Sequence, residues 1–454
     1  MLDIEALTPL TPEVISRQAT IIIGTIGQAT HGNLTLVRAL SGVDTHRFSS
    51  EHTRHLTIKL GYAGAKIYKS VPRSPKNALS GDEEERPMYA SLRKTTPDRF
   101  TDENGVTWAL ERHVSFIDSF DHEFLMRCML NGTVAMDAAL LVIAGNDACP
   151  PPQTAVHLAA IEIMGVKNVI IVHNKADLLT TDEAMAHHDQ IKQFVQGTVA
   201  ANAPIISISA FQRQDIDLVC EHVVRSIPIP LRDFTSHPKL VIIRSFNGNK
   251  PGEGVEKLQG GVAGGSLLQG VLRLGDEIEI RPGIFSRNED GKVISHTPIV
   301  TRIVSLKSDE NNLDYAVPGG LIGVGTLMDP SLTRSDRLVG HVLGLKGSLP
   351  DVFTRLEVNF FLLRRVLGLR RPDGSKGARI EKLAKGEMLM IHISAATCGG
   401  KILAVKSDAA KILVSQPVCT QEGDKIALSR RIEKRWRLIG WGEIRRGIKS
   451  DDSS

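Results

Sequence analysis

The stretch GQATHGNL, residues 27–34, follows the apolar run ATIIIGTI and contains two glycines with the spacing of a phosphate-binding loop. Gly27 and Gly32 would let backbone N–H groups approach a phosphate at the N-terminus of the helix expected over LTLVRALSG. Such loops usually continue with Lys and then Ser or Thr, where this chain has Asn and Leu. The other candidate contacts are Thr30, His31, Asn33, Leu34 and Thr35. A tight strand-to-helix turn without a ligand would need the same two glycines. The glycine pair alone therefore does not show that the loop binds phosphate.

The segment NKAD, residues 174–177, ends an apolar strand expected over NVIIVH. The Asp177 carboxylate could accept two hydrogen bonds from the N1–H and exocyclic amine of guanine, a donor pair that adenine lacks. Asn174 would brace the surrounding loops, and the stem of Lys175 would cover the ring. In SISA, Ser209 and Ala210 would place a backbone N–H on the guanine oxygen. A helix-capping loop is the alternative for NKAD, and a simple turn for SISA.

The strand expected over HVSFID ends at Asp118, where a carboxylate could hold a magnesium-bound water or cap the next helix. The following segment DSFDH would sense a γ-phosphate. Five short elements occur in the order that a GTPase domain requires: the phosphate loop, HLTIK, DSFDH, NKAD and SISA. This order, rather than any single element, predicts a GTPase domain.

Composition limits the class of protein. A chain of 454 residues with 42% hydrophobic and 23% charged residues predicts two or three globular domains. The net charge of +4 does not by itself indicate a nucleic-acid partner. Five cysteines without a CxxC pair are typical of reduced intracellular thiols. With no apolar run of about 18 residues and no signal-peptide core, we expect a cytoplasmic protein without a membrane partner.

The order of elements predicts an α/β GTPase domain followed by two barrels. From about residue 19 to 230, apolar strands alternate with helix-length segments, including TVAMDAALL and TAVHLAAIEIMGV, which predicts a mostly parallel sheet with helices on both faces. Residues 69–107 are polar and proline-rich, and we interpret them as an insertion loop. Later strands are short and punctuated by glycines, as in antiparallel β-barrels, with GGVAGGS expected at a tight turn. The predicted domains are 1–235, 236–346 and 347–454.

The chain resembles the gamma subunit of eukaryotic translation initiation factor two, a relative of elongation factor Tu, nearly from end to end. Similar stretches include TIKLGYAGAKIYK, KLQGGVAGGSLLQGVL and KIALSRRIEKRWRLIGWGEIRRG. The resemblance implies GTP or GDP with magnesium, and delivery of methionyl initiator tRNA to the small ribosomal subunit together with alpha and beta subunits. It assigns Thr57 and Asp118 to magnesium and His122 to positioning the attacking water. It also assigns Asn174, Lys175 and Asp177 to guanine.

The departures from this family fall on the phosphate and magnesium half of the site. Asn33 replaces the Lys that contacts the β- and γ-phosphates, which removes a charge-assisted partner. Leu34 replaces a magnesium-binding hydroxyl, and Thr35 lies about 100° further around a helix. Asp121 stands where the second switch has a glycine and adds a negative charge near the γ-phosphate. We therefore expect intact guanine recognition with weakened GTP binding and hydrolysis.

The resemblance leaves two functions open. One is a working gamma-like GTPase with a tolerant loop, and the other is a pseudo-GTPase paralogue that binds the initiation-factor subunits or tRNA without turnover. An elongation-type carrier is disfavoured because the similarity outside the GTPase motifs is specific to the gamma subunit. Family members often carry a zinc knuckle in the insertion, but residues 1–127 contain no cysteine, so no zinc is expected. The arginine-rich segment SRRIEKRWRLIGWGEIRRG predicts either an RNA contact or a barrel strand with solvated arginines.

Overall fold

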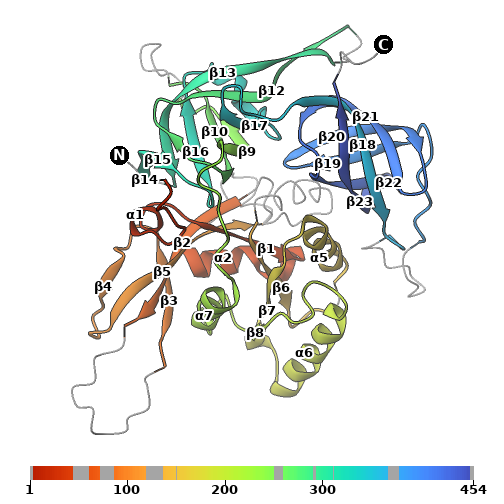
Figure 1. Cartoon of the computed structure of the whole chain (residues 1–454). Helices are drawn as coiled ribbons and strands as arrows, with labels where there is room; N and C mark the ends of the chain where they lie inside the picture. Colours follow the sequence, from red (N-terminus) through yellow and green to blue (C-terminus); the bar gives the residue numbers. More distant parts are fainter. Residues whose placement is uncertain are drawn as a thin grey trace.

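The chain folds into three units, an α/β unit and two antiparallel barrels (Figure 1). A computed structural model describes residues 4–43, 61–71, 86–118, 136–149, 151–249, 259–289, 293–309, 311–366 and 378–449. The expected fold class is confirmed. The domain boundaries expected near 235 and 346 lie between the last helix of the first unit and the first barrel, and between the two barrels; their exact positions stay predictions.

The first unit is built on an eight-stranded sheet with the order β3-β2-β5-β1-β6-β7-β8, in which β4 pairs with β5. Its strands are β1 (Ile21–Gly27), β2 (Gly61–Ser70), β3 (Tyr89–Arg93), β4 (Arg99–Thr101), β5 (Thr107–Asp118), β6 (Ala138–Ala144), β7 (Asn168–Asn174) and β8 (Ile205–Ser207). Strands β5, β1, β6, β7 and β8 are parallel, whereas β2, β3 and β4 are antiparallel. Every residue of β1 and β6 is buried, so both faces of the sheet need a cover.

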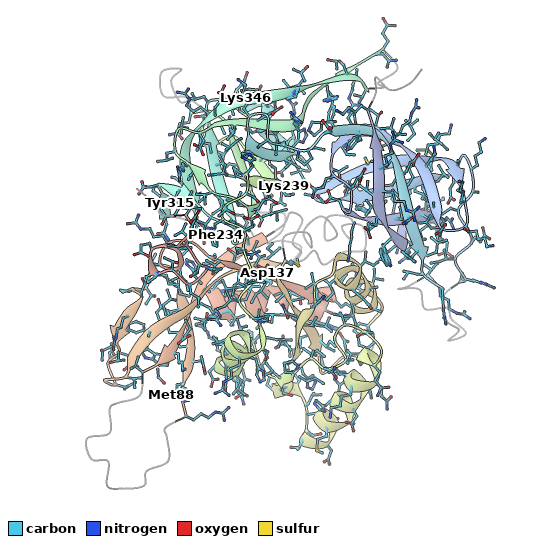
Figure 2. All side chains as sticks on the ribbon, viewed as in Figure 1. Met88, Asp137, Phe234, Lys239, Tyr315 and Lys346 are labelled. Carbon is cyan, nitrogen blue, oxygen red and sulfur yellow. The ribbon has the colours of Figure 1, made fainter. Side chains whose placement is uncertain are left out.

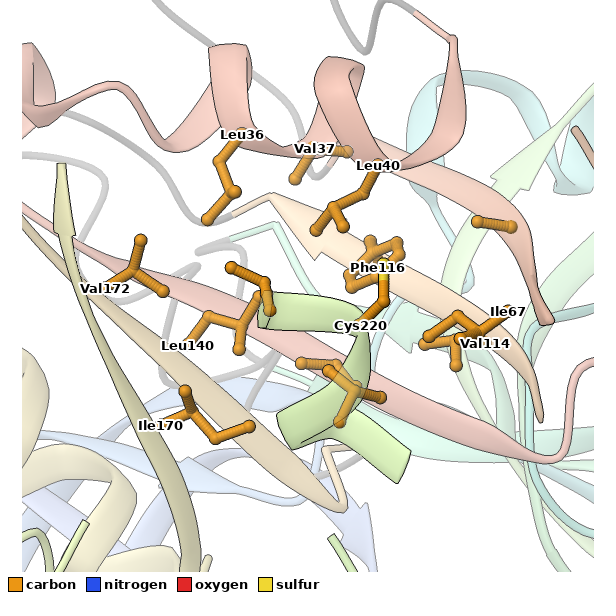
Figure 3. Close-up of a cluster of buried hydrophobic side chains, with 14 of the residues drawn as sticks. Leu36, Val37, Leu40, Ile67, Val114, Phe116, Leu140, Ile170, Val172 and Cys220 are labelled. Carbon is orange, nitrogen blue, oxygen red and sulfur yellow. The ribbon is translucent and has the colours of Figure 1, made fainter. Parts of the chain in front are cut away.

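Helices supply this cover on both faces. They are α1 (Pro12–Ile15), α2 (Asn33–Ser41), α5 (Pro152–Met164), α6 (Thr181–Val195) and α7 (Ile216–Ser226), with the 3₁₀ turns η1 (Ala29–His31) and η3 (Ala176–Leu178). On one face, α2 and α7 bury Leu36, Leu40 and Val223 against the sheet, and Figure 3 shows the α2 side chains pointing into this core. On the other face, α5 and α6 contribute Ile161 and Ile191 to a second core. No helix within the described ranges is long and apolar enough to cross a membrane.

Three local predictions were wrong. The expected insertion loop contains β3 and β4, whose half-exposed residues pair with β2 and β5 and show no clear alternation of polar and apolar types. The second half of TVAMDAALL belongs to β6, not to a helix, because its apolar residues are buried on both faces. In GGVAGGS, Gly264 and Gly265 lie inside the strand Val262–Gln269 at a register shift, and not at a turn: a Cβ on Gly265 would lie 2.1 Å from the Val241 carbonyl oxygen.

The second and third units are both closed rings of antiparallel strands. The second unit contains β9 (Lys239–Phe246), β10 (Val262–Gln269), β11 (Leu272–Arg273), β12 (Glu277–Arg287), β13 (Val293–Ser308), β14 (Asn311–Leu313), β15 (Tyr315–Ala316), β16 (Ile322–Thr326) and β17 (Val342–Leu345), with η5 (Pro330–Leu332) and η6 (Arg334–Asp336). Its ring closes because β12 pairs with both β17 and β13. The third unit contains β18 (Val352–Leu362), β19 (Met388–Ile393), β20 (Ala396–Val405), β21 (Ala409–Cys419), β22 (Lys425–Ile432) and β23 (Arg435–Ile448).

Specific contacts join the first unit to each barrel. The Gln18 side chain donates to the Val317 carbonyl at 2.6 Å and accepts from the Val317 N–H at 3.2 Å. Where the chain leaves the first unit, Arg232 pairs with Asp137, which Figure 2 places near the start of the second unit. Helix α5 contacts the third unit, because Ile163 packs in one apolar cluster with Leu438. The first unit therefore touches both barrels through residues outside the predicted nucleotide loops.

Candidate functional site

The predicted phosphate loop forms the turn from β1 to α2. Strand β1 ends at Gly27, η1 follows, and Gly32 adopts φ +93° immediately before Asn33 begins α2. A Cβ on Gly27 would lie 2.4 Å from the Val142 carbonyl oxygen, and one on Gly32 would lie 2.5 Å from Asn174 Nδ2. Both glycines are therefore needed for close approach as well as for backbone conformation. The loop presents a helix N-terminus, where backbone N–H groups favour an anion.

Asn33 occupies the position at which the family pattern has lysine. Its side chain is 2% exposed, and neither Nδ2 nor Oδ1 has a hydrogen-bond partner within the part of the chain that the structure describes. Leu34 is half-buried, and α2 begins at Asn33 without a shift that would bring the Thr35 hydroxyl to position 34. A buried amide without partners costs about 1–3 kcal/mol. The loop thus offers a neutral amide, and no cation or hydroxyl, at residues 33 and 34.

His31 does not replace the missing positive charge. The ring is fully buried, with Nδ1 at 3.3 Å from the Val142 carbonyl oxygen. Nε2 lies 3.2 Å from the Asp147 carboxylate but lacks the alignment of a hydrogen bond. Burial lowers the pKa of His31 below its ordinary value, so the imidazole is neutral at pH 7. The neighbouring Thr30 is exposed.

Asn174 joins the phosphate loop to the SISA loop. Its Nδ2 donates to the His31 carbonyl at 2.8 Å, and its Oδ1 accepts from the Ala210 N–H at 3.0 Å. Lys175 follows with φ +62°, and Asp177 is exposed on η3. The structure thus brings both loops together around a single buried side chain. The Asp177 carboxylate is accessible to a ligand.

The SISA loop is held mainly by its own backbone. Ser209 is buried, and its hydroxyl accepts a hydrogen bond from the Gln212 N–H at 3.3 Å. The Ala210 N–H, which we expected to face the guanine oxygen, donates to Asn174. Immediately after it, the Phe211 ring is 87% exposed. Contact of Ser209 and Ala210 with guanine stays a prediction.

The remaining predicted site residues are described in part or not at all. Thr57, Asp121 and His122 lie outside the described residues. Asp118 is the last residue of β5, where its backbone is in register with Thr25 of β1. Its position at the strand end beside β1 is therefore set by the sheet. The roles of Thr57 and Asp118 toward magnesium, and of His122 toward water, stay predictions.

His157 is a loop contact that sequence reasoning missed. The Gly27 N–H donates to its Nδ1 at 3.2 Å from the inner face of α5. Burial lowers the pKa of His157 to about 4, so the ring stays neutral and can act as an acceptor. A histidine among the apolar positions of a helix gives no sequence signal for a partner 130 residues away.

We expect His157→Gln to flatten the acid side of the stability profile. The unfolded histidine takes up a proton near pH 6.5, whereas the folded one does so only near pH 4, so wild-type stability falls as the pH drops between these values. Gln can keep an acceptor for Gly27 without titrating. Between pH 7 and 4 the free energy of unfolding should fall by about 3 kcal/mol less in the variant than in the wild type. Urea unfolding across this pH range measures the difference. Equal dependence of stability on pH in the two proteins would contradict the lowered pKa of His157.

The arginine-rich C-terminal segment forms the barrel strands β22 and β23, as one of the two interpretations expected. Arg430 pairs with Glu387, and Arg437 is buried. Trp441 stacks on Phe361 with ring centroids 4.5 Å apart. Contacts within the third unit therefore explain some of the arginine and tryptophan side chains of this segment. Exposed cations remain at Arg431, Lys434, Arg435, Arg445 and Arg446, and an RNA contact there stays a prediction.

Comparisons with known proteins agree with this architecture. Residues 18–229 match the model of the elongation factor Tu GTP binding domain, residues 260–344 match elongation factor Tu domain 2, and residues 354–444 match the C-terminal model of initiation factor eIF2 gamma. A selenocysteine-specific elongation factor from bacteria superimposes with a TM-score of 0.67 at 18% identity, over 94% of this chain and 58% of its own. The elongation factor SelB of Methanococcus maripaludis, bound to a GTP analogue, gives 0.66 at 17% identity, over 96% and 81%. At such identities these two structures support the fold alone.

Two relatives are similar along almost the whole chain. Eukaryotic translation initiation factor 2 subunit 3 of Drosophila melanogaster is 54% identical over 98% of this chain and 92% of its own length. The subunit gamma of Schizosaccharomyces pombe is 54% identical over 98% of both. A GTPase domain with these loops, followed by two barrels, defines a translational GTPase, a class of guanine-nucleotide-binding proteins that usually use magnesium. The chain belongs to the gamma-subunit family of eukaryotic translation initiation factor 2, a factor made of several subunits.

Proposed function

We propose that the chain binds guanine nucleotide and methionyl initiator tRNA and delivers the tRNA to the small ribosomal subunit, in a complex with alpha and beta subunits. In this proposal Asn174, Lys175 and Asp177 recognise guanine, as the family pattern implies. GTP binding and hydrolysis are weaker than in a gamma subunit with the usual loop. The chain acts in the cytoplasm.

The observation that carries the weakened nucleotide site is Asn33. Its buried amide has no partner among the described residues, and it stands where a lysine would meet the β- and γ-phosphates. A hydrogen bond from a charged group contributes about 1.5–3 kcal/mol, and one from a neutral amide about 0.5–1.5 kcal/mol. The exchange of lysine for asparagine therefore costs about one kcal/mol or more of phosphate binding.

The magnesium site is incomplete in the same region. In the family pattern the residue at position 34 supplies a hydroxyl, but Leu34 is apolar, and Thr35 points away from that position. Thr57 and Asp118 would hold the ion, which would neutralise phosphate charge when bound. His122 would orient water. Because one protein oxygen is missing, the residues fit a magnesium ion poorly. We propose no zinc site, since residues 1–127 contain no cysteine.

A pocket between the first two units supports tRNA binding. It has a volume of about 300 Å³ and lies between Tyr62 of β2 and the outer surface of the second unit. It is lined by glycines of β10 and β16, by Lys307 and Asp309, and by Arg244, which pairs with Asp336. Phe246 adds an apolar surface. Charged side chains beside an apolar surface suit an aminoacyl-nucleotide, whose phosphate and methionyl side chain need the two environments.

The same loop chemistry also favours a second candidate, a pseudo-GTPase paralogue. Such a chain would keep the subunits or tRNA as partners and would act in binding or regulation without turnover. Asn33 and Leu34 are compatible with this function because neither residue can bind a phosphate or metal as the usual pair does. Nucleotide turnover, and not partner binding, separates the two candidates.

The test combines nucleotide and partner measurements on the purified chain. We expect a labelled GTP analogue to bind with magnesium at lower affinity than it binds a gamma subunit with the usual Gly-Lys-Ser loop, while the alpha and beta subunits co-purify. Slow hydrolysis in the presence of methionyl initiator tRNA and small subunits supports the first candidate. Binding of partners with no hydrolysis supports the paralogue. Preference for an elongator tRNA, or failure to bind either subunit, would contradict the proposal.

A further inference from the structure

Two stacked histidines lie behind the NKAD loop. His173 is the second-last residue of β7, and His187 lies on the buried side of α6 with Ile191. Their rings are 20° from parallel with centroids 5.0 Å apart, and the two residues are 0% and 7% exposed. We call these two residues the histidine pair. Asn174, which connects the two nucleotide loops, follows His173 directly, so the pair lies next to the predicted site.

A hydrogen-bond chain with one direction runs through the neutral histidine pair. His187 Nε2 lies 2.9 Å from the Asp147 backbone carbonyl oxygen, which can only accept, so Nε2 carries a hydrogen. Nδ1 of a neutral His187 then accepts from His173 Nε2 at 3.1 Å. His173 Nδ1 in turn accepts from the Ser207 hydroxyl at 3.1 Å. All four ring nitrogens are therefore satisfied when both rings are neutral.

A further proton would place an uncompensated charge in this chain. On His187 Nδ1 it would set two N–H donors against each other, and on His173 Nδ1 it would leave a buried cation beside Ser207. The nearest carboxylate in the chain, that of Asp147, faces His31 instead. Burial, and then the charges of His187 and His188, lowers the pKa of His173 to about 4. The folded arrangement thus favours the neutral rings.

The other titratable groups around the histidine pair do not supply a counter-charge. They are Glu183, His188 and Asp189 on α6, Asp147 after β6, Lys175 after β7 and His31 in the phosphate loop. The Glu183 carboxylate accepts from Thr180 at the start of α6, and Asp189 lies 3.9 Å from His188. Within the described part of the chain, neither ring of the pair forms an ion pair. A charged ring would therefore be stable only where water reaches it.

The histidine pair also holds the loop after β6, residues 145–149, in place. The Gly145 N–H donates to the Asn174 carbonyl at 2.9 Å, and a Cβ on Gly145 would lie 2.8 Å from His173 Nε2. His187 binds the same loop at the Asp147 carbonyl. Access of water to either ring therefore requires this loop or α6 to move away from the NKAD loop.

We propose that the histidine pair is a proton-sensitive positioning element, which holds the loop after β6 against the NKAD loop while both rings are neutral and releases it as the pH falls. Ser207 is exposed, so a proton can enter from water at that end of the hydrogen-bond chain. A guanine nucleotide that needs the NKAD loop in place would then bind less tightly in acid, and this consequence rests on the proposed function. The release of the loop itself requires no nucleotide.

Hydrogen exchange of the Gly145 amide, followed by mass spectrometry on the ligand-free full chain, tests the inference. In an opened loop His173 regains its ordinary pKa of 6.5, whereas the closed ring stays neutral down to about pH 4. From about pH 7.5 to about pH 5.5 the opened form is thereby favoured about ten-fold. The protection factor, which is corrected for the intrinsic exchange rate, should fall by the same factor of about ten.

Variants separate titration of the pair from a purely structural role. His173→Gln offers an amide that cannot titrate, so its protection factor should stay level across this pH range. His187→Gln keeps a donor for the Asp147 carbonyl and replaces the first variant if circular dichroism shows that it is unfolded. His222→Gln removes a partly exposed histidine that bonds to Ser226 on α7, and it should keep the ten-fold fall. A pH-independent protection factor in the wild type, or an equal fall in His173→Gln, overturns the inference.

Addition of GDP distinguishes this inference from the proposed function. A nucleotide that binds only the closed loops should restore the protection factor near pH 5.5. If GDP changes the exchange at neither pH, guanine-nucleotide binding is contradicted. The ligand-free series still decides whether the histidine pair responds to protons.

Discussion

A chain with Asn33→Lys and Leu34→Ser is expected to bind GTP with magnesium about 10²–10³ times more tightly than the wild type. The lysine would supply a charge-assisted contact to the β- and γ-phosphates, worth about 1.5–3 kcal/mol. The serine would return a hydroxyl to the magnesium, and a further 1–2 kcal/mol is a reasonable scale for one such ligand contact. Together these values come to about 2.5–5 kcal/mol, which corresponds to about two to three and a half powers of ten in Kd.

The structure also gives this prediction a matched control. Asn33→Leu removes the buried amide, both of whose polar atoms lack partners among the described residues, and replaces it with an apolar group of similar size. It should stabilise the chain by about 1 kcal/mol and add no affinity for nucleotide. Isothermal titration with GTP and GDP, with and without magnesium, measures the effect. An unchanged GTP affinity in the Asn33→Lys, Leu34→Ser chain would contradict the account of the phosphate loop, and adding Asp121→Gly would then locate the defect in the second switch.

Arg232→Met is expected to destabilise the first unit by about 3–5 kcal/mol. Arg232 Nη2 lies 2.6 Å from Asp137 Oδ2, and the two side chains are only 12% and 13% exposed. The same carboxylate oxygen accepts the Ile22 N–H of β1 at 2.8 Å, and Arg232 also donates to the Thr20 carbonyl. Removal of one partner leaves a buried charge unpaired, which costs more than the pair itself contributes. Urea unfolding followed by far-ultraviolet circular dichroism measures the loss.

The stability lost in Arg232→Met should increase as the pH rises. Burial raises the pKa of Asp137 even with Arg232 present, and removal of the arginine would raise this pKa further. A carboxyl group whose pKa is higher in the folded state favours folding at low pH, and this contribution disappears as the pH rises from about 4 through the folded pKa. Arg232→Met should therefore differ least from the wild type near pH 4 and most near pH 8. Arg232→Met combined with Asp137→Asn should recover much of the stability, and a loss independent of pH would contradict this reading.

The sequence was sufficient for the central sheet because its strands are apolar on both faces, as in ALLVIAG and NVIIVHN. The turn from β1 to α2 was also predictable, since Gly27 and Gly32 occur between a strand and a helix. Strands β3 and β4 were missed because partial exposure removes the alternation on which strand prediction depends. Contacts such as Gly27 to His157 depend on tertiary packing across 130 residues, and no local pattern encodes them.

The two hydrogen bonds of Asn174 have a consequence for how a ligand binds to the loops. This side chain hydrogen-bonds to both the phosphate loop and the SISA loop. The two loops are therefore held together by the protein itself and not by a ligand. A ligand that contacts both loops therefore needs little ordering of these two loops when it binds. Its departure likewise leaves the two loops in place. We therefore expect the contact between these two loops to persist whether or not a ligand is bound.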